Sequence, residues 1–93
     1  MATSNEVVVS HSVGLHARPA AVFAKTATTF SSTIQLENLT RGTQPINAKS
    51  VLSILSAGIQ MNDLLRISAE GTDEEAAVHA LSHLITSDFA ETE

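Results

Sequence analysis

A histidine and an arginine stand two positions apart in the run Gly14-Leu15-His16-Ala17-Arg18-Pro19-Ala20. Because an Ala-rich segment with helical spacing follows, His16 is predicted at or next to the N-cap of a helix. Free backbone N–H groups at such a terminus favour bound anions and disfavour the imidazolium, so we expect a neutral, nucleophilic ring. Arg18 adds a planar donor fork suited to phosphate. On local physics alone, an ordinary capping or surface histidine is the commoner interpretation.

The elements that must position this run follow from residue periodicity. Strands are predicted at 6–10, 33–37, 44–46 and 64–69, and helices at 19–27, at 50–57 and from 73 onward. Pro45 restricts the third strand to a sheet edge, and Arg41-Gly42 is a plausible turn before it. The order β-α-β-β-α-β-α indicates an α+β open-faced sandwich, a four-stranded antiparallel sheet with three helices on one face.

The last helix carries two further signals. Thr72 and Glu75 are spaced as a capping box, which would start the helix. An apolar stripe is expected to face the sheet, formed by Ala77, Leu81, Leu84 and Ile85. In the predicted helix at 50–57, the apolar residues cover a wider arc than one buried face needs; they are Val51, Leu52, Ile54 and Leu55.

Length and composition restrict the class of protein. The chain has 93 residues, three aromatic residues and no cysteine. We therefore expect a single domain over 1–93, with frayed termini at 1–4 and 87–93, held by aliphatic packing without disulfides or thiol chemistry. The sequence offers no aromatic platform for nucleic acid and no segment long enough to cross a bilayer. No targeting segment is evident, so a cytoplasmic location is expected. The chain is also expected to be a monomer.

Charge is unevenly distributed along the chain. Residues 1–60 contain four basic and two acidic residues, whereas residues 61–93 contain one basic and eight acidic residues. A weakly basic functional surface beside an acidic segment would suit anionic ligands, although a plain surface gradient is the commoner explanation.

Three motifs together resemble the histidine-containing phosphocarrier (HPr) family of the phosphoenolpyruvate-dependent phosphotransferase system, which serves sugar transport. They lie in the right order and spacing over about residues 5–86, as Gly14-Leu15-His16-Ala17-Arg18-Pro19-Ala20-Ala21, Ala48-Lys49-Ser50 and Ile67-Ser68-Ala69-Glu70-Gly71-Thr72-Asp73-Glu74. The resemblance implies the open-faced sandwich and a phosphoryl carrier with a phosphohistidine intermediate, rather than an enzyme that turns over a substrate. No cofactor is implied.

The resemblance also implies roles for particular residues. His16 would accept a phosphoryl group on Nδ1 from phosphorylated enzyme I and pass it to an enzyme IIA, and Arg18 would stabilise the phosphate. Ser50 matches a regulatory site for a serine kinase and phosphorylase, while also being a favoured N-cap. The partner-docking residues would be Ala17, Ala21, Val51, Leu52 and Leu55, which leaves Ile54 to face the core.

Two alternatives stay open within this resemblance. The chain could be a regulatory interaction module controlled through Ser50, with no chemistry at His16. The phosphoryl group could also serve nitrogen regulation or dihydroxyacetone phosphorylation instead of sugar transport. Few lysines surround the predicted helix at 50–57, so attraction to an acidic enzyme I would be weaker than in the most familiar family members. Lys25 and Lys49 are as well explained by solvation as by docking.

The remaining histidines have ordinary explanations. His11 is expected in a loop, and a metal-dependent hydrolase using His11 and His16 lacks a nearby carboxylate base. His79 and His83 are spaced i, i+4 behind Glu75, but they lie on the wet side of the helix without a third strong ligand. No metal site is therefore predicted.

Overall fold

A computed structural model describes residues 2–10, 17–87 and 89 of the chain. Four strands and three helices alternate in the order β1, α1, β2, β3, α2, β4 and α3. Their bounds are β1 Thr3–Val8, α1 Ala17–Thr28, β2 Thr33–Asn38, β3 Ile46–Asn47, α2 Val51–Ser56, β4 Leu64–Glu70 and α3 Glu74–Thr86. This order confirms the predicted β-α-β-β-α-β-α fold.

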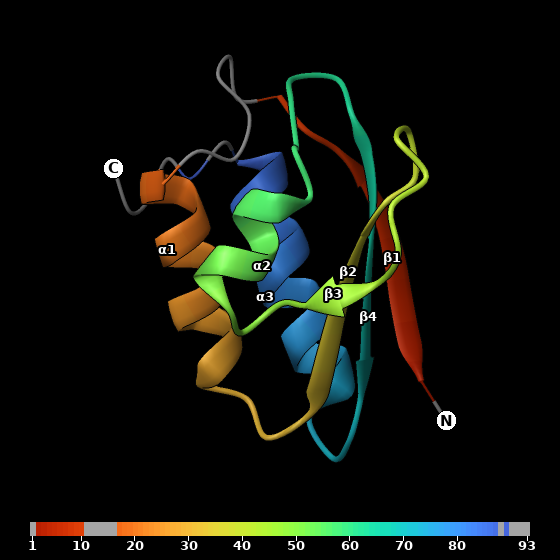
Figure 1. Cartoon of the computed structure of the whole chain (residues 1–93). Coiled ribbons are helices and arrows are strands. Elements are labelled where there is room, and N and C mark those ends of the chain that lie inside the picture. The colour runs from red at the N-terminus through yellow and green to blue at the C-terminus, as the bar shows by residue number, and fades with distance from the viewer. Residues whose placement is uncertain (1, 11–16, 88, 90–93) are drawn as a thin grey trace.

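The strands form one antiparallel sheet in the spatial order β1-β4-β2-β3. All three helices cover the same face of this sheet, and the other face is open (Figure 1). Side chains alternate accordingly along β2, where Ile34 and Leu36 are buried while Thr33 and Gln35 are exposed. The expectation of a sheet covered on one side is confirmed.

Helices α1 and α3 bury the apolar faces that their sequences predict. In α1, Ala20, Phe23, Ala24 and Ala27 are buried, and Pro19 lies in the first turn, where its missing N–H breaks no helical bond. In α3, the buried stripe contains Ala77, Leu81, Leu84 and Ile85. Small alanine side chains let α1 pack closely against α2 and α3.

The first and third strands differ from the prediction in their bounds. β1 begins at Thr3, three residues before the β-branched run, because β4 is long enough to pair with it from Ala69 at Thr3 to Leu64 at Val8. β3 contains only Ile46 and Asn47, since Pro45 has no N–H to donate to the ladder. The edge position expected for β3 is correct.

The predicted capping box at α3 is wrong. The N-cap is Asp73 and the first helical residue is Glu74, so Thr72 stands outside the helix. The Asp73 carboxylate accepts hydrogen bonds from the backbone N–H groups of Ser31 and Ser32, at 2.8 and 3.0 Å, and from the Ser32 hydroxyl. Tertiary partners therefore replace the local cap. Glu74 instead accepts the Gly71 N–H at 3.2 Å.

The expectation of frayed ends is wrong for several terminal residues. Thr3 and Ser4 belong to β1, and the Thr3 hydroxyl donates to the Glu74 carboxylate at 2.5 Å. Near the other end, Phe89 is 1% exposed and its N–H donates to the Leu84 carbonyl oxygen at 2.8 Å. An aromatic side chain just beyond α3 is thus part of the core. Its burial was not predicted because the residues around it are mostly polar. Residues 1, 88 and 90–93 lie outside the described residues.

Candidate functional site

The predicted phosphoryl acceptor, His16, lies outside the described residues, as does His11. The description resumes at Ala17, the first residue of α1. Ala17 and Arg18 are exposed, whereas Pro19 is buried and anchors the first turn against the core. No acidic residue stands in this turn. The first turn of α1 therefore has backbone N–H groups without partners inside the helix and one exposed guanidinium, with no carboxylate of the same turn to compete for them.

Ser50 is the N-cap of α2, as its residue type predicts. Its backbone is extended, at φ −110° and ψ 116°, and its Oγ accepts the Ser53 N–H at 3.2 Å. The Ser50 carbonyl oxygen accepts the Ile54 N–H at 3.0 Å, which closes the first turn. The side chain is partly exposed. Ser50 therefore stabilises the short helix while its hydroxyl stays near the surface.

Helix α2 displays apolar side chains that the core does not use. Leu52 is 79% exposed and Leu55 is 39% exposed, whereas Ile54 is completely buried, as expected. Val51 is partly buried and packs against the core, so it contributes less surface than predicted.

Ala17 and Ala21 add exposed surface on the neighbouring helix. α1 and α2 lie side by side, with the start of α1 and the end of α2 toward the same end of the molecule (Figure 1). The two helices thus form one surface, which we call the α1–α2 surface and define by Ala17, Ala21, Val51, Leu52 and Leu55.

Sequence reasoning missed Met61, which is 49% exposed in the turn that follows α2. The turn is closed by the Asp63 N–H donating to the Gln60 carbonyl oxygen at 3.0 Å, and Asn62 adopts a positive φ of 75°. Asn tolerates this left-handed conformation better than most residues. The available signal for an exposed apolar contact was an apolar residue flanked by polar ones, in the segment between the predicted helix at 50–57 and the predicted strand at 64–69.

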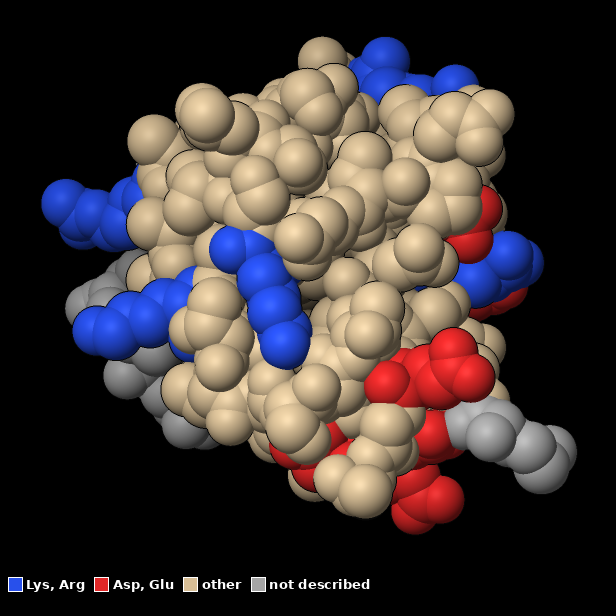
Figure 2. All heavy atoms as spheres, turned by 60° about the horizontal axis from the view of Figure 1, so that its bottom comes forward, with Lys and Arg blue, Asp and Glu red and all other residues tan. Residues whose placement is uncertain are grey.

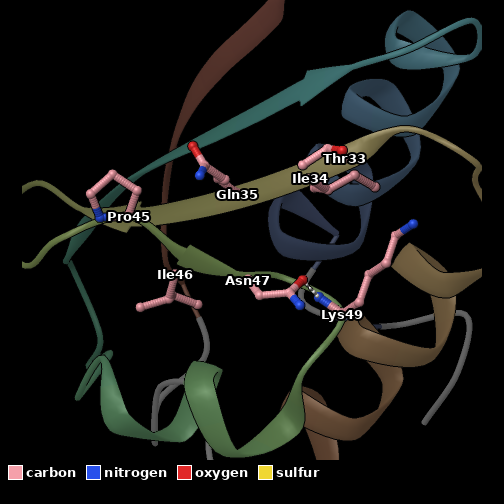
Figure 3. Close-up of a pocket in the computed structure, with 7 residues that line it drawn as sticks. All are labelled: Thr33, Ile34, Gln35, Pro45, Ile46, Asn47 and Lys49. Carbon is pink, nitrogen blue, oxygen red and sulfur yellow. Dashed lines mark hydrogen bonds between the residues drawn. The ribbon is translucent and has the colours of Figure 1, made fainter.

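Lys49 has a structural partner rather than a purely solvated charge. Its ammonium donates to the Phe30 carbonyl oxygen at 2.9 Å, which ties the start of α2 to the chain that leaves α1. Lys49 also borders a depression of about 370 Å³ between β2 and β3, lined by Thr33, Ile34, Gln35, Pro45, Ile46, Asn47 and Lys49 (Figure 3). None of the residues of the α1–α2 surface lines it, so the depression is separate from the candidate site.

Acidic side chains gather on one part of the molecular surface. Figure 2 shows this acidic group, while Lys and Arg side chains are spread over the rest of the view, some of them beside acidic ones. The sequence concentrates acids at the start of α3, at Glu70, Asp73, Glu74 and Glu75. The first turn of α1 has none. The first turn of α1 therefore lies outside the acidic group at the start of α3, as the charge distribution along the chain predicts.

The described part of the chain holds neither a metal cluster nor a membrane-spanning helix. Across residues 2–10, 17–87 and 89, no three His, Cys, Asp or Glu side chains are grouped to hold a metal ion. His79 and His83 are both on the exposed side of α3. Within the same ranges, no helix combines the length and apolar character that spanning a membrane requires.

Comparisons with known proteins agree with this geometry. A family model described as "PTS HPr component phosphorylation site" matches residues 3–87. Phosphocarrier protein HPr of Mycoplasma pneumoniae is 42% identical over 80 residues, which cover 86% of this chain and 89% of that protein. The solved structure of HPr-C-His from Thermoanaerobacter tengcongensis superposes with a TM-score of 0.87 at 42% identity, covering 98% of this chain and 99% of that one.

A second group of relatives is longer. The multiphosphoryl transfer protein of Vibrio cholerae is 40% identical over 83 residues, which cover 89% of this chain but only 21% of that protein. The similarity is thus to a domain of those proteins and to the whole of the shorter ones. From the family model, the matched relatives and the shared fold, this chain belongs to the HPr family of the phosphotransferase system.

Proposed function

We propose that this chain accepts a phosphoryl group on Nδ1 of His16 from phosphorylated enzyme I and passes it to an enzyme IIA-type acceptor. The observation that carries the proposal is the start of α1 at Ala17, the residue that follows His16, with Arg18 exposed and no acid in the first turn. The matching family model, which is described by a phosphorylation site, supports the same chemistry.

The chemistry needs a neutral ring and a moderate anion site. The Nδ1 lone pair of His16 attacks phosphorus, and the new N–P bond forms as the bond between phosphorus and the donor breaks. Free N–H groups at the start of α1 and the Arg18 guanidinium would then stabilise the negative phosphoryl oxygens. Pro19 contributes no N–H, so it leaves the anion site smaller than a full first turn would make it. Moderate stabilisation suits a carrier, because the group must leave again.

The direct test is phosphorylation of the full chain by enzyme I and phosphoenolpyruvate, followed by intact mass measurement. We expect an acid-labile adduct on wild type and none on His16→Ala. Arg18→Ala should be modified more slowly, at unchanged stability, because Arg18 is exposed at the surface of the first turn. An unmodified wild type, or equal modification of His16→Ala, would refute the proposal.

We further propose that the α1–α2 surface is where partners dock. Exposed Leu52 and Leu55 beside Ala17 and Ala21 provide apolar area next to the start of α1. Partner identity is open among sugar transport, nitrogen regulation and dihydroxyacetone phosphorylation. Offering the phosphorylated chain separately to an acceptor from each route, and measuring transfer to each, would choose among them.

The second candidate function is a regulatory interaction module controlled by phosphorylation of Ser50. The observation that favours it is a partly exposed hydroxyl directly before the exposed residues of α2. A phosphate there would add negative charge beside the proposed docking surface. This requires a serine kinase as a partner. If Ser50-phosphorylated and unmodified chains bind enzyme I and lysate proteins equally, the regulatory role is excluded.

A further inference from the structure

A buried carboxylate that the proposed chemistry does not use lies at the end of the molecule where β1 ends and α1 begins. Asp63 is 4% exposed and stands directly before β4. One of its oxygens, Oδ2, accepts three hydrogen bonds: from Asn38 Nδ2 at 2.9 Å, the Gln60 N–H at 2.9 Å and Arg41 Nε at 3.0 Å. Burial alone would raise the pKa of Asp63, but these donors together lower it.

The partners of Asp63 come from two separate parts of the chain, the β2–β3 hairpin and the turn at 60–63. Asn38 is completely buried at the end of β2, and its side-chain amide also donates to the Ala57 carbonyl oxygen, at 3.3 Å, at the end of α2. Its Oδ1 accepts the Arg41 N–H at 3.3 Å. The carboxylate therefore joins the β2–β3 hairpin to the turn at 60–63, and Asn38 extends this network to the C-terminal end of α2.

The turn at 60–63 is also hydrogen-bonded to Val9, which precedes His16 in the sequence. The Asn62 N–H donates to the Val9 carbonyl oxygen at 2.8 Å, and the Val9 N–H donates to the Asp63 carbonyl oxygen at 3.0 Å. Val9 is 1% exposed and lies one residue past the end of β1. The end of β1 and the turn before β4 run side by side at the top of Figure 1.

We propose that Asp63 is a positioning residue for phosphoryl transfer. Its carboxylate fixes the turn that anchors Val9, ahead of His16, and that displays the half-exposed Met61 after α2. This inference rests on the proposed function of His16. Rigid supports of this kind matter because small displacements of a reacting group or a contact surface slow transfer strongly. Asp63 acts through the backbone of other residues and needs no contact with the phosphoryl group.

Asp63→Asn is the variant that tests the proposal, and Asp73→Asn is its matched control. The amide in Asp63→Asn would keep the shape of the side chain but lose the charge that balances Arg41. Asp73 also accepts bonds from two backbone amides and a side chain, but at the opposite end of the molecule, where α3 begins. Both variants should lose stability, so the assay temperature must be one at which circular dichroism shows each to be fully folded.

The measurement is the rate of His16 phosphorylation by enzyme I as a function of chain concentration, giving kcat and KM for each variant. We expect kcat/KM of Asp63→Asn to fall about tenfold, and that of Asp73→Asn to stay within about twofold of wild type. Amide hydrogen exchange at Val9 and Asn62 should accelerate in Asp63→Asn alone. Wild-type kinetics for Asp63→Asn, or an equal loss in Asp73→Asn, would overturn the positioning role.

Failure of the positioning role can be distinguished from failure of the proposed function. If wild type itself is not phosphorylated on His16, the proposed function fails, whereas phosphorylated wild type with an unaffected Asp63→Asn removes the positioning role only. Should Asp63→Asn fail to fold, Arg41→Gln replaces it, since the Arg41 side chain is 41% exposed and two other donors to Asp63 remain. A fall in kcat/KM of about threefold supports the proposal, and an unchanged value contradicts it.

Discussion

The Asp73 carboxylate accepts the backbone N–H of Ser31 at 2.8 Å, across 42 positions of sequence. With the bonds from Ser32, this contact fastens the loop after α1 to the start of α3. The Ser32 hydroxyl and the Ser31 amide, which bond the ionised form, hold the pKa of Asp73 at about 2, below its usual 3.8. Asp73 therefore joins the two loops more strongly when it is ionised than when it is protonated.

Stability should consequently fall in acid. A carboxyl whose pKa is lower in the folded state stabilises fully above its unfolded pKa, and loses that contribution as pH drops toward the folded value. We expect the free energy of unfolding of wild type to decrease between pH 3.8 and about 2, the two values for Asp73. Asp73→Asn should be less stable at pH 7 and show a shallower decrease over this range. Urea denaturation at several pH values measures both, and parallel curves would contradict the assignment.

The periodicity of apolar residues predicts which face an element buries, but not which distant groups bind its ends. The alternation along β2 and the stripe from Ala77 to Ile85 were predictable, since each depends on one element burying one face. The cap of α3 was not, because Thr72 and Glu75 satisfy a local pattern while Asp73 satisfies partners 41 and 42 residues away. Contacts between residues so far apart along the chain cannot be predicted from the local pattern of a single sequence.

Phe89 should contribute strongly to stability although it lies beyond the last helix. Its side chain is 1% exposed, so truncation would leave a cavity in the core. We expect Phe89→Ala to lower the free energy of unfolding by about 3–5 kcal/mol, the usual range for a buried aromatic residue. His79→Ala, on the exposed side of α3, serves as control and should change it by less than about 0.5 kcal/mol. Equal effects in urea denaturation would show that Phe89 does not support the core.

Leu52 and Ile54 should separate partner docking from folding. Leu52 is 79% exposed, so Leu52→Ser is expected to leave stability within about 0.5 kcal/mol while raising KM for enzyme I. Ile54 is completely buried two positions away, and Ile54→Ala should cost about 2–5 kcal/mol. At a temperature where Ile54→Ala remains folded, its KM should match wild type. An unchanged KM for Leu52→Ser would argue against docking through α2.

The exposed residues of α2 could be predicted from the sequence, whereas the exposure of Met61 could not. The wide apolar arc of α2 predicts that some of its apolar residues are exposed, and the family resemblance assigns Leu52 and Leu55 to the surface and Ile54 to the core, as the structure shows. Met61 depends on the turn that presents it, and that turn depends on buried Asn38 and Asp63, whose polar side chains predict a surface position. Two buried polar residues are compatible with the fold because they hydrogen-bond each other and because Gln60, Arg41 and Ala57 satisfy their remaining polar atoms.

Ser50 allows its capping and regulatory roles to be measured apart. Ser50→Ala removes the Oγ that accepts the Ser53 N–H, and should cost about 0.5–2 kcal/mol. Ser50→Asp retains an N-cap acceptor and adds a charge before the exposed residues of α2, so stability should stay near wild type. If charge at this position regulates docking, Ser50→Asp should change KM for enzyme I, whereas Ser50→Ala, assayed where it is fully folded, should not. Equal KM values for the three chains, with the expected order of stabilities in urea, would leave Ser50 a helix cap only.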